Sequence, residues 1–158
     1  MRRTRIAAGA ALVTGALAAA GLAFAPAALA VAPGTATITA DCGGFGGGEA
    51  TLTATQSGTA ATMTVDSSAI TAPIGLGEDS ISSTLTLVKA GGGTVAFTGT
   101  KNPAMAAGDP VRVGPLNGTV ASGDSLEAFG GSLKMTVFGI TITCSATGPQ
   151  APGPFVFD

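Results

Sequence analysis

The side chains able to carry out catalysis are few, and the types present exclude several mechanisms. The 158-residue chain has no histidine and no tyrosine, against nine aspartates and glutamates. Without histidine, neither a Ser-His-Asp nor a Cys-His arrangement can form. A Ser-Lys pair has no S-x-x-K motif to support it, because Ser132 and Lys134 are separated by a single residue. The residue types therefore argue against the common hydrolase mechanisms.

The acidic residues contain one dense pair, Glu78-Asp79 in LGEDS, and otherwise lie mostly at expected turns. Glycoside hydrolysis requires two carboxyl groups placed around the scissile bond, and a calcium loop requires a D-x-D pattern. A solvated turn accounts for Glu78 and Asp79 better than either chemistry, and both are candidate contact residues of a loop. We expect no enzymatic activity, no cofactor and no metal, and we keep a hydrolase as the third alternative.

The glycine-rich segment DCGGFGGGEA, residues 41–50, has the composition of a phosphate-binding loop without its spacing. A dinucleotide fingerprint would need glycine at Glu49, and the lysine of a P-loop is missing. A lipid-attachment motif fails because Asp41, not a small apolar residue, precedes Cys42. We interpret the segment as a turn between two strands. Phe45 folds back onto the core in the interpretation we favour, and is offered outward as a contact in the alternative.

Cys42 and Cys144 are the only cysteines, and each follows a Thr-Ile-Thr run. By strand parity, Cys42 shares a face with Ile38 and Cys144 shares one with Ile142, so both should point inward. Two cysteines without histidine make a poor metal-binding set. We therefore predict a Cys42–Cys144 disulfide, which fits an exported protein. Closing a loop of about a hundred residues contributes roughly 4 to 5 kcal/mol in the chain-entropy treatment.

The first thirty residues have the three parts of a secretory signal peptide. A basic MRRTR segment precedes an uncharged apolar stretch, and Ala28–Ala30 form a small-x-small cleavage motif. This pattern predicts removal of residues 1–30 and one extracellular domain over residues 31–158. An uncleaved membrane anchor is the alternative, but the stretch is rich in alanine and glycine and weakly hydrophobic. The Arg2-Arg3 pair lacks the fuller twin-arginine pattern, which favours general secretion.

The charge balance of the exported part restricts its partners. Removing the three arginines of the leader leaves four basic residues against nine acidic ones, a net charge of −5. Binding to nucleic acid or to an anionic membrane requires clustered lysine and arginine. We therefore expect no nucleic-acid partner and, after cleavage, no membrane association. The partners that remain are a protein, the cell wall or a small hydrophobic ligand.

Period-two alternation of apolar and polar residues dominates residues 31–158 and indicates eight or nine short strands. The segments are TATITAD (35–41), EATLTAT (49–55), ATMTVD (61–66), SSTLTLVK (82–89), TVAFTGT (94–100), PVRV (110–113), SLKMTVF (132–138) and ITITCS (140–145). Such strands predict an antiparallel β-sandwich, immunoglobulin-like or related, closed by one disulfide and without an internal domain boundary.

Turn-forming residues separate the strands. Hairpin turns are expected at QSG (56–58), KAGGG (89–93), LNGT (116–119) and FGGS (129–132). The Asn-Gly pair of LNGT favours a type I′ turn. KNPAMAAGDP, residues 101–110, is the longest irregular stretch, and its Met105 is another candidate contact residue. The last segment, Phe155–Phe157, places two aromatic rings on one side and could dock on a sheet edge.

Some segments resemble known exported proteins. The leader looks like those of high-GC actinobacteria, and KNPAMAAGDPVRVGPLNGTV and SLKMTVFGITITC resemble small secreted actinobacterial proteins of unknown function. That likeness covers most of residues 31–158 and implies no active site. VAPGTATITA is similar to the mature start of neocarzinostatin-type apoproteins, which implies an acidic sandwich that carries a hydrophobic small molecule. Those proteins have two disulfides and this chain has two cysteines, so no binding residue is carried over.

These observations favour a secreted, non-catalytic structural or interaction module at the cell surface or in the medium. The alternative is an extracellular carrier of a small hydrophobic ligand, held in a cleft lined by Met, Phe and Leu. A deep apolar pocket would favour the carrier. An exposed flat apolar or threonine-rich face would favour the interaction module. The T-x-T pairs recur at irregular spacings, which is typical of strand propensity on solvent-facing positions.

Overall fold

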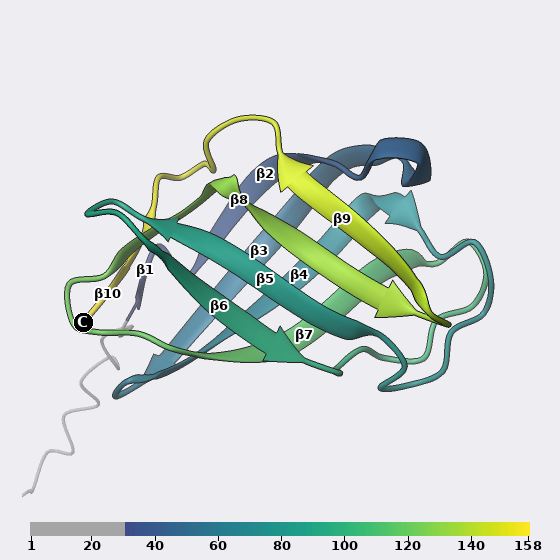
Figure 1. Ribbon diagram of the computed structural model, residues 1–158, viewed down its shortest axis with the longest axis horizontal. Coiled ribbons are helices and arrows are strands. Elements are labelled where there is room, and N and C mark those ends of the chain that lie inside the picture. The colour runs from purple at the N-terminus through teal and green to yellow at the C-terminus, as the bar shows by residue number, and fades with distance from the viewer. Residues whose placement is uncertain (1–30) are drawn as a thin grey trace, which may run out of the picture.

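Ten strands make up nearly all of the regular structure in the computed structural model, which describes residues 31–158 (Figure 1). The predicted signal peptide, residues 1–30, lies outside the described residues. Within the described part, no helix has the length and hydrophobicity needed to cross a bilayer. The strands are β1 (Val31–Ala32), β2 (Thr35–Asp41), β3 (Gly47–Ser57), β4 (Ala60–Thr71), β5 (Ser82–Lys89), β6 (Thr94–Gly99), β7 (Pro110–Thr119), β8 (Ser125–Val137), β9 (Ile140–Ala146) and β10 (Phe155–Phe157).

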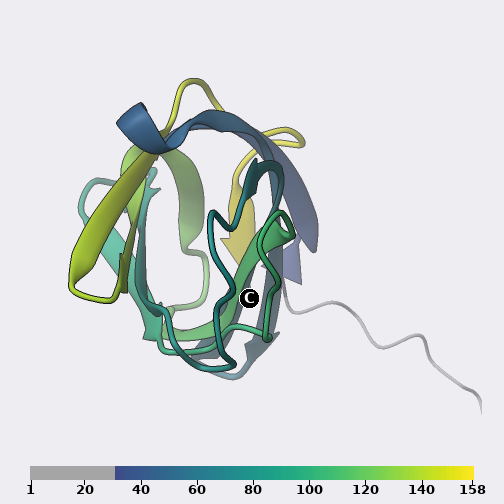
Figure 2. The same ribbon diagram turned by 90° about the vertical axis from the view of Figure 1, so that its right-hand side faces the viewer.

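Eight of these strands close into an antiparallel barrel, so the predicted β-sandwich was wrong. The order is β8-β5-β6-β7-β4-β3-β2-β9, and β9 pairs with β8 to complete the circle. All pairings are antiparallel. Figure 2 views the resulting ring from one end. Alternating sequences satisfy the inner faces of a sandwich and of a barrel equally well, because both require inward side chains at every second residue.

Two pairs of neighbouring strands in the barrel are joined at only one or two register positions, and we call these junctions seams. β2 and β9 are joined at two register positions, Ala40↔Ala146 and Asp41↔Ser145. β6 and β7 are joined at one, Thr98↔Asn117. The other neighbours around the ring pair over longer stretches. The seams divide the barrel into two layers, β9-β8-β5-β6 in front and β2-β3-β4-β7 behind in Figure 1.

The core follows the predicted alternation. Apolar residues at every second position point into the barrel, and the largest fully buried side chains are Phe97, Phe155, Phe157, Leu52, Met63, Leu87, Leu116, Leu126 and Val113. Threonines occupy the outward positions and pair across strands. Thr55 and Thr62 have hydroxyl oxygens 2.7 Å apart, and Thr136 and Thr141 have theirs 2.9 Å apart. Strand propensity and cross-strand pairing therefore account for the threonine pattern.

Two predicted hairpin turns are instead parts of strands. Asn117 and Gly118 lie within β7, with Asn117 opposite Thr62 of β4. The FGGS segment lies within β8, where the register with β5 shifts between Thr86 and Val88. A Cβ on Gly131 would lie 2.0 Å from the carbonyl oxygen of Thr86. Glycine is therefore needed here for close approach of two strands at a bulge, which bends the strand without ending it.

The C-terminal segment closes one end of the barrel. β10 pairs with β8 on one side and with β1 on the other, and Phe155 and Phe157 are completely buried. The predicted docking of this segment on a sheet edge is thus confirmed. The buried Gln150 holds the chain leading to β10, because its Oε1 accepts a 2.9 Å hydrogen bond from the backbone nitrogen of Ala128. At the opposite end no strand is added to the barrel within residues 31–158, and the β4–β5 and β6–β7 loops border it instead.

Candidate functional site: an apolar pocket at the open end

A pocket of about 350 Å³ lies at the end of the barrel opposite β10. Three segments surround it: the 3-10 turn η1 (Gly43–Phe45), the β4–β5 loop and the β8–β9 hairpin. None of the lining residues is charged. They are Gly44, Phe45, Ile70, Thr71, Ala72, Pro73, Ile74, Leu76, Ile81, Val111, Met135, Val137, Phe138, Ile140 and Ile142. We call this cavity the mouth pocket.

Exposed large apolar side chains gather around the mouth pocket. Six such side chains exist in the described part, and four of them line this pocket. They are Phe45, Ile74, Phe138 and Ile140, with exposed fractions of 53%, 52%, 71% and 55%. Single exposed apolar residues are ordinary, but a cluster around a concavity marks a binding surface. We call these four residues the apolar rim.

The β8–β9 hairpin carries one rim residue in a strained conformation. Val137 and Ile140 face each other across the hairpin, leaving Phe138 and Gly139 as a two-residue turn. Both have positive φ, 50° at Phe138 and 76° at Gly139. Type I′ turns of this kind favour Asn or Gly at the first central position. A bulky residue there is disfavoured by about 1 to 2 kcal/mol, so stability does not explain Phe138.

The disulfide holds a second part of the rim in place. Cys42 and Cys144 are bonded, as the sequence predicted. The turn beyond Cys42 is tightened by two hydrogen bonds: Gly43 N donates to Asp41 Oδ1 over 2.8 Å, and Cys42 N donates to the Gly46 carbonyl over 2.8 Å. Phe45 is therefore presented outward at the rim, and the interpretation that it folds back onto the core was wrong. Side chains do not alternate between two faces in a glycine-rich turn, so alternation could not predict which way this ring points.

The β4–β5 loop is held by Asn102, a buried residue of the β6–β7 loop. Its Oδ1 accepts hydrogen bonds from the backbone nitrogens of Ser80 and Ile81, each 2.8 Å long. Its Nδ2 donates to the carbonyls of Gly77 and Pro103, each at 2.8 Å. All the donors and acceptors of this side chain's amide are used. The amide therefore fixes the loop that supplies one wall of the mouth pocket.

The remaining predicted contact residues brace this loop and do not line the mouth pocket. Met105 is buried, and its backbone forms a two-hydrogen-bond bridge with Leu76. Asp79 accepts a 2.5 Å hydrogen bond from Lys101 Nζ, which raises the pKa of Lys101. Glu78 is exposed beside this pair. The contact role predicted for these three residues stays a prediction, and their observed role in the structure is to shape the loop.

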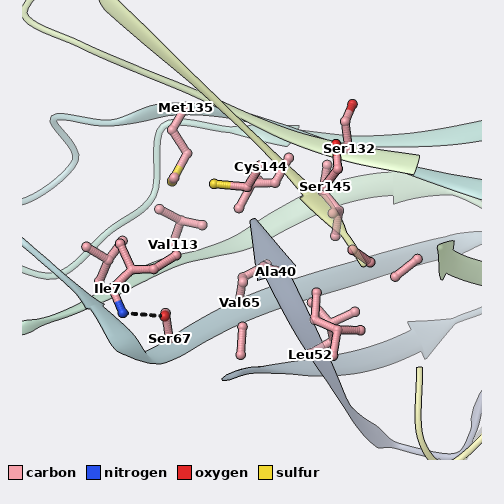
Figure 3. Close-up of a pocket in the computed structure, with 17 residues that line it drawn as sticks. Ala40, Leu52, Val65, Ser67, Ile70, Val113, Ser132, Met135, Cys144 and Ser145 are labelled. Atoms are coloured by element: carbon pink, nitrogen blue, oxygen red, sulfur yellow. Dashed lines mark hydrogen bonds between the residues drawn. The ribbon is translucent and has the colours of Figure 1, made fainter. Parts of the chain in front are cut away.

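A second, smaller cavity of about 40 Å³ lies deeper in the barrel (Figure 3). We call it the inner cavity. Three residues line both it and the mouth pocket: Ile70 of β4, Val111 of β7 and Met135 of β8. The serine Ser67 in its wall is engaged, since its Oγ accepts a 2.9 Å hydrogen bond from Ile70 N. These three apolar side chains, which we call the neck, therefore lie between the two cavities.

This arrangement can remove an apolar molecule from water and select it by shape. Neither cavity is lined by a titratable side chain, since Cys144 is disulfide-bonded. Within residues 31–158, no three His, Cys, Asp or Glu side chains lie close enough to hold a metal ion. The acids with basic partners lie elsewhere, as in Asp66–Arg112 and Asp124–Lys89. An apolar molecule placed in either cavity would be removed from contact with water without meeting a charged group.

Sequence reasoning missed most of the rim. It assigned Ile140, which is 55% exposed, to an inward strand face and gave no role to Ile74 or Phe138. The same assignment was right for Ile142, which packs against the core. One available signal was the uninterrupted apolar run around the VFGI turn, residues 137–140, where polar turn residues are the norm.

Comparisons with protein families, curated proteins and solved structures found no match to this chain.

Proposed function

We propose that the protein is a secreted, non-catalytic β-barrel that carries a small apolar molecule in the open end of its barrel. The mouth pocket is the observation that supports this most directly. Its volume of about 350 Å³ falls within the range of small-molecule sites, about 300 to 1,000 Å³. Its lining is uncharged, and three of its residues also line the inner cavity. The concave shape favours the carrier over a flat interaction face.

The form of the rim adds a second argument. Four large apolar side chains remain in water around the mouth pocket, and one of them occupies a strained turn. Burying an exposed aromatic or aliphatic side chain contributes about 1.5 to 3 kcal/mol. A bound apolar molecule would recover part of this free energy at several rim positions at once. Features that oppose stability and gather at one concavity are typical of binding sites.

Export is part of the proposal. Disulfides persist in oxidising compartments, and the Cys42–Cys144 bond agrees with an extracellular location. The predicted signal peptide over residues 1–30 supplies the route.

A second candidate is the interaction module, in which the apolar rim docks on a partner protein or on the cell wall. The observation that favours it is the outward projection of Phe138, which is 71% exposed. A rim that serves only to enclose a small guest would keep its aromatic rings turned further inward.

The test is a fluorescence titration of residues 31–158 with the neutral probe N-phenyl-1-naphthylamine. Two matched variants replace exposed phenylalanines: Phe138→Asn at the rim and Phe129→Asn on β8, outside the pocket lining. We expect saturable one-to-one binding by the unmodified protein. Phe138→Asn should weaken it about tenfold, because a contact worth about 1.5 kcal/mol or more is lost. Phe129→Asn should leave the affinity unchanged.

Absence of saturable binding by the unmodified protein would overturn the carrier. Equal effects of the two variants would show that the probe adheres to exposed phenylalanine in general, and would equally count against a site in the mouth pocket.

A further inference from the structure

We propose that the mouth pocket and the inner cavity act together as one site for a linear, unbranched alkyl chain with an uncharged head. The tail passes the neck of Ile70, Val111 and Met135 and ends in the inner cavity, while the head stays at the apolar rim. This inference rests on the proposed function and deepens it by naming the ligand class.

The neck is formed by side chains from both layers of the barrel. Ile70 and Val111 belong to the neighbouring strands β4 and β7, where Thr71 pairs with Pro110. Met135 projects from β8 in the opposite layer of the barrel. In Figure 3, Ile70 and Met135 stand at one side of the inner cavity, and Ala40, Leu52 and Ser145 lie toward the other. The three neck residues therefore separate the two cavities and are shared by both.

The small volume of the inner cavity limits the shape of the ligand that can enter it. A dry cavity that binds benzene measures about 150 Å³, whereas this one measures about 40 Å³. A ring does not fit, but the narrow end of a polymethylene chain does, with small adjustments of a flexible methionine such as Met135. The mouth pocket alone is wide enough for a ring. Selection for a slender ligand therefore arises from the inner cavity.

The lining of the inner cavity is suited to hydrocarbon. Most of it is aliphatic, and alanines create the free space: Ala40, Ala50, Ala128 and Ala146. Met135, Cys144 and three serines complete it, and one of the serines, Ser67, is already hydrogen-bonded within the wall. A chain end placed here would exchange contacts with water for van der Waals contacts with the lining.

The charges around the site determine the head group. No lysine or arginine lines either cavity. Of the basic residues in the described part, Lys89, Lys101 and Arg112 each pair with an aspartate. Lys134 is exposed on β8 between the inward Leu133 and Met135. A carboxylate head would find no cationic partner here, so a neutral alcohol or ester fits better than a fatty acid.

The experiment compares 1-decanol with 1-adamantanol, two ten-carbon alcohols, by displacement of N-phenyl-1-naphthylamine. The key variant is Ala50→Leu, which fills the inner cavity from β3 without touching the mouth pocket, since Ala50 lines the inner cavity alone. We expect Ala50→Leu to weaken 1-decanol about tenfold and to leave 1-adamantanol unchanged. Decanoate should bind the unmodified protein at least tenfold more weakly than 1-decanol.

Unchanged binding of 1-adamantanol also reports that the variant is folded. Should Ala50→Leu not fold, Ala128→Leu fills the same cavity from β8. On the unmodified protein, linear alcohols should gain about fourfold in affinity per methylene until the inner cavity is full.

The outcomes separate the two proposals. If neither alcohol binds the unmodified protein, the carrier function fails and this inference falls with it. If both bind but Ala50→Leu weakens them equally, or weakens neither, the carrier stands and the alkyl-chain site is overturned. Tight binding of decanoate would overturn the neutral head.

Discussion

At the scale of single residues, Phe138 occupies a position that the stability of the fold does not explain. Its backbone lies in the left-handed region and its ring is mostly in water. Neither property stabilises the fold. A residue kept under such conditions is expected to serve a contact.

Replacing Phe138 with asparagine should therefore raise the free energy of unfolding by about 1 kcal/mol, because asparagine adopts the left-handed conformation with less strain. Urea unfolding followed by circular dichroism measures this. Phe129→Asn is the control: Phe129 is also an exposed phenylalanine but lies within β8, and its replacement should bring no gain. A destabilised Phe138→Asn variant would show that the ring supports the hairpin, and the argument from strain would fail.

Asp124 is the residue through which we expect acid to act on stability. Its carboxylate accepts hydrogen bonds from Ala121 N and from Lys89 Nζ, each 2.9 Å long. The first, and then the second, lower the pKa of Asp124. Because the folded pKa is depressed, the stabilisation is complete above the unfolded pKa of about 4 and is lost as the pH falls through the folded value.

The variant Asp124→Asn should be less stable at pH 7 by about 1 kcal/mol and should lose less stability below pH 4 than the unmodified protein. Urea midpoints measured between pH 2 and 7 would reveal parallel curves if Asp124 has no part in the acid response. Phe157 N also donates to the Asp124 carbonyl, so the same turn supports the closed end.

Residue-level prediction succeeded where strand parity applies and failed at turns. Parity placed Cys42 and Cys144 on inward faces, and the structure joins them. Phe45 and Phe138 occupy turns, where side-chain direction depends on backbone angles that alternation does not encode. About half of the residues that line the mouth pocket lie in turns and loops, which explains why the sequence identified little of this candidate site.

At the scale of elements, the disulfide reinforces the seam between β2 and β9. That seam has two register pairs, and the bond between Cys42 and Cys144 lies one position beyond Asp41↔Ser145. It therefore replaces backbone pairing at a point where the barrel would otherwise part.

The double variant Cys42→Ala/Cys144→Ala should lose about 4 to 5 kcal/mol of unfolding free energy, the chain-entropy value for a loop of this length. Denaturant unfolding with and without dithiothreitol provides the control, because reductant should lower the stability of the unmodified protein and leave the variant unaffected. A loss below about 1 kcal/mol would mean that the two register pairs suffice to hold the seam.

Strand positions were well predicted, but two strand interiors were taken for turns. The Asn-Gly pair in β7 and the Gly-Gly pair in β8 both carry local turn signals. Tertiary pairing overrides them, since Asn117 pairs with both Thr62 and Thr98 and Gly131 lies against Thr86. Local composition cannot register a neighbouring strand that arrives from elsewhere in the chain.

At the scale of the whole molecule, the error in fold class comes from closure. The sequence marks which residues face inward, and both layers of the barrel satisfy that pattern. Closure of the barrel depends on three register pairs. Thr98↔Asn117 joins β6 to β7, and Ala40↔Ala146 and Asp41↔Ser145 join β2 to β9. So few pairings leave no periodic trace in the sequence.

The closed end of the barrel limits the route by which a ligand could enter and leave the proposed site. Phe155 and Phe157 fill the far side of the barrel. Under the proposed function, a ligand would therefore enter and leave at the mouth pocket, and a second molecule could not displace the first from behind. The C-terminus also lies at the closed end (Figure 1), so a protein tethered to a sensor chip by its C-terminus would turn its mouth pocket toward the solution.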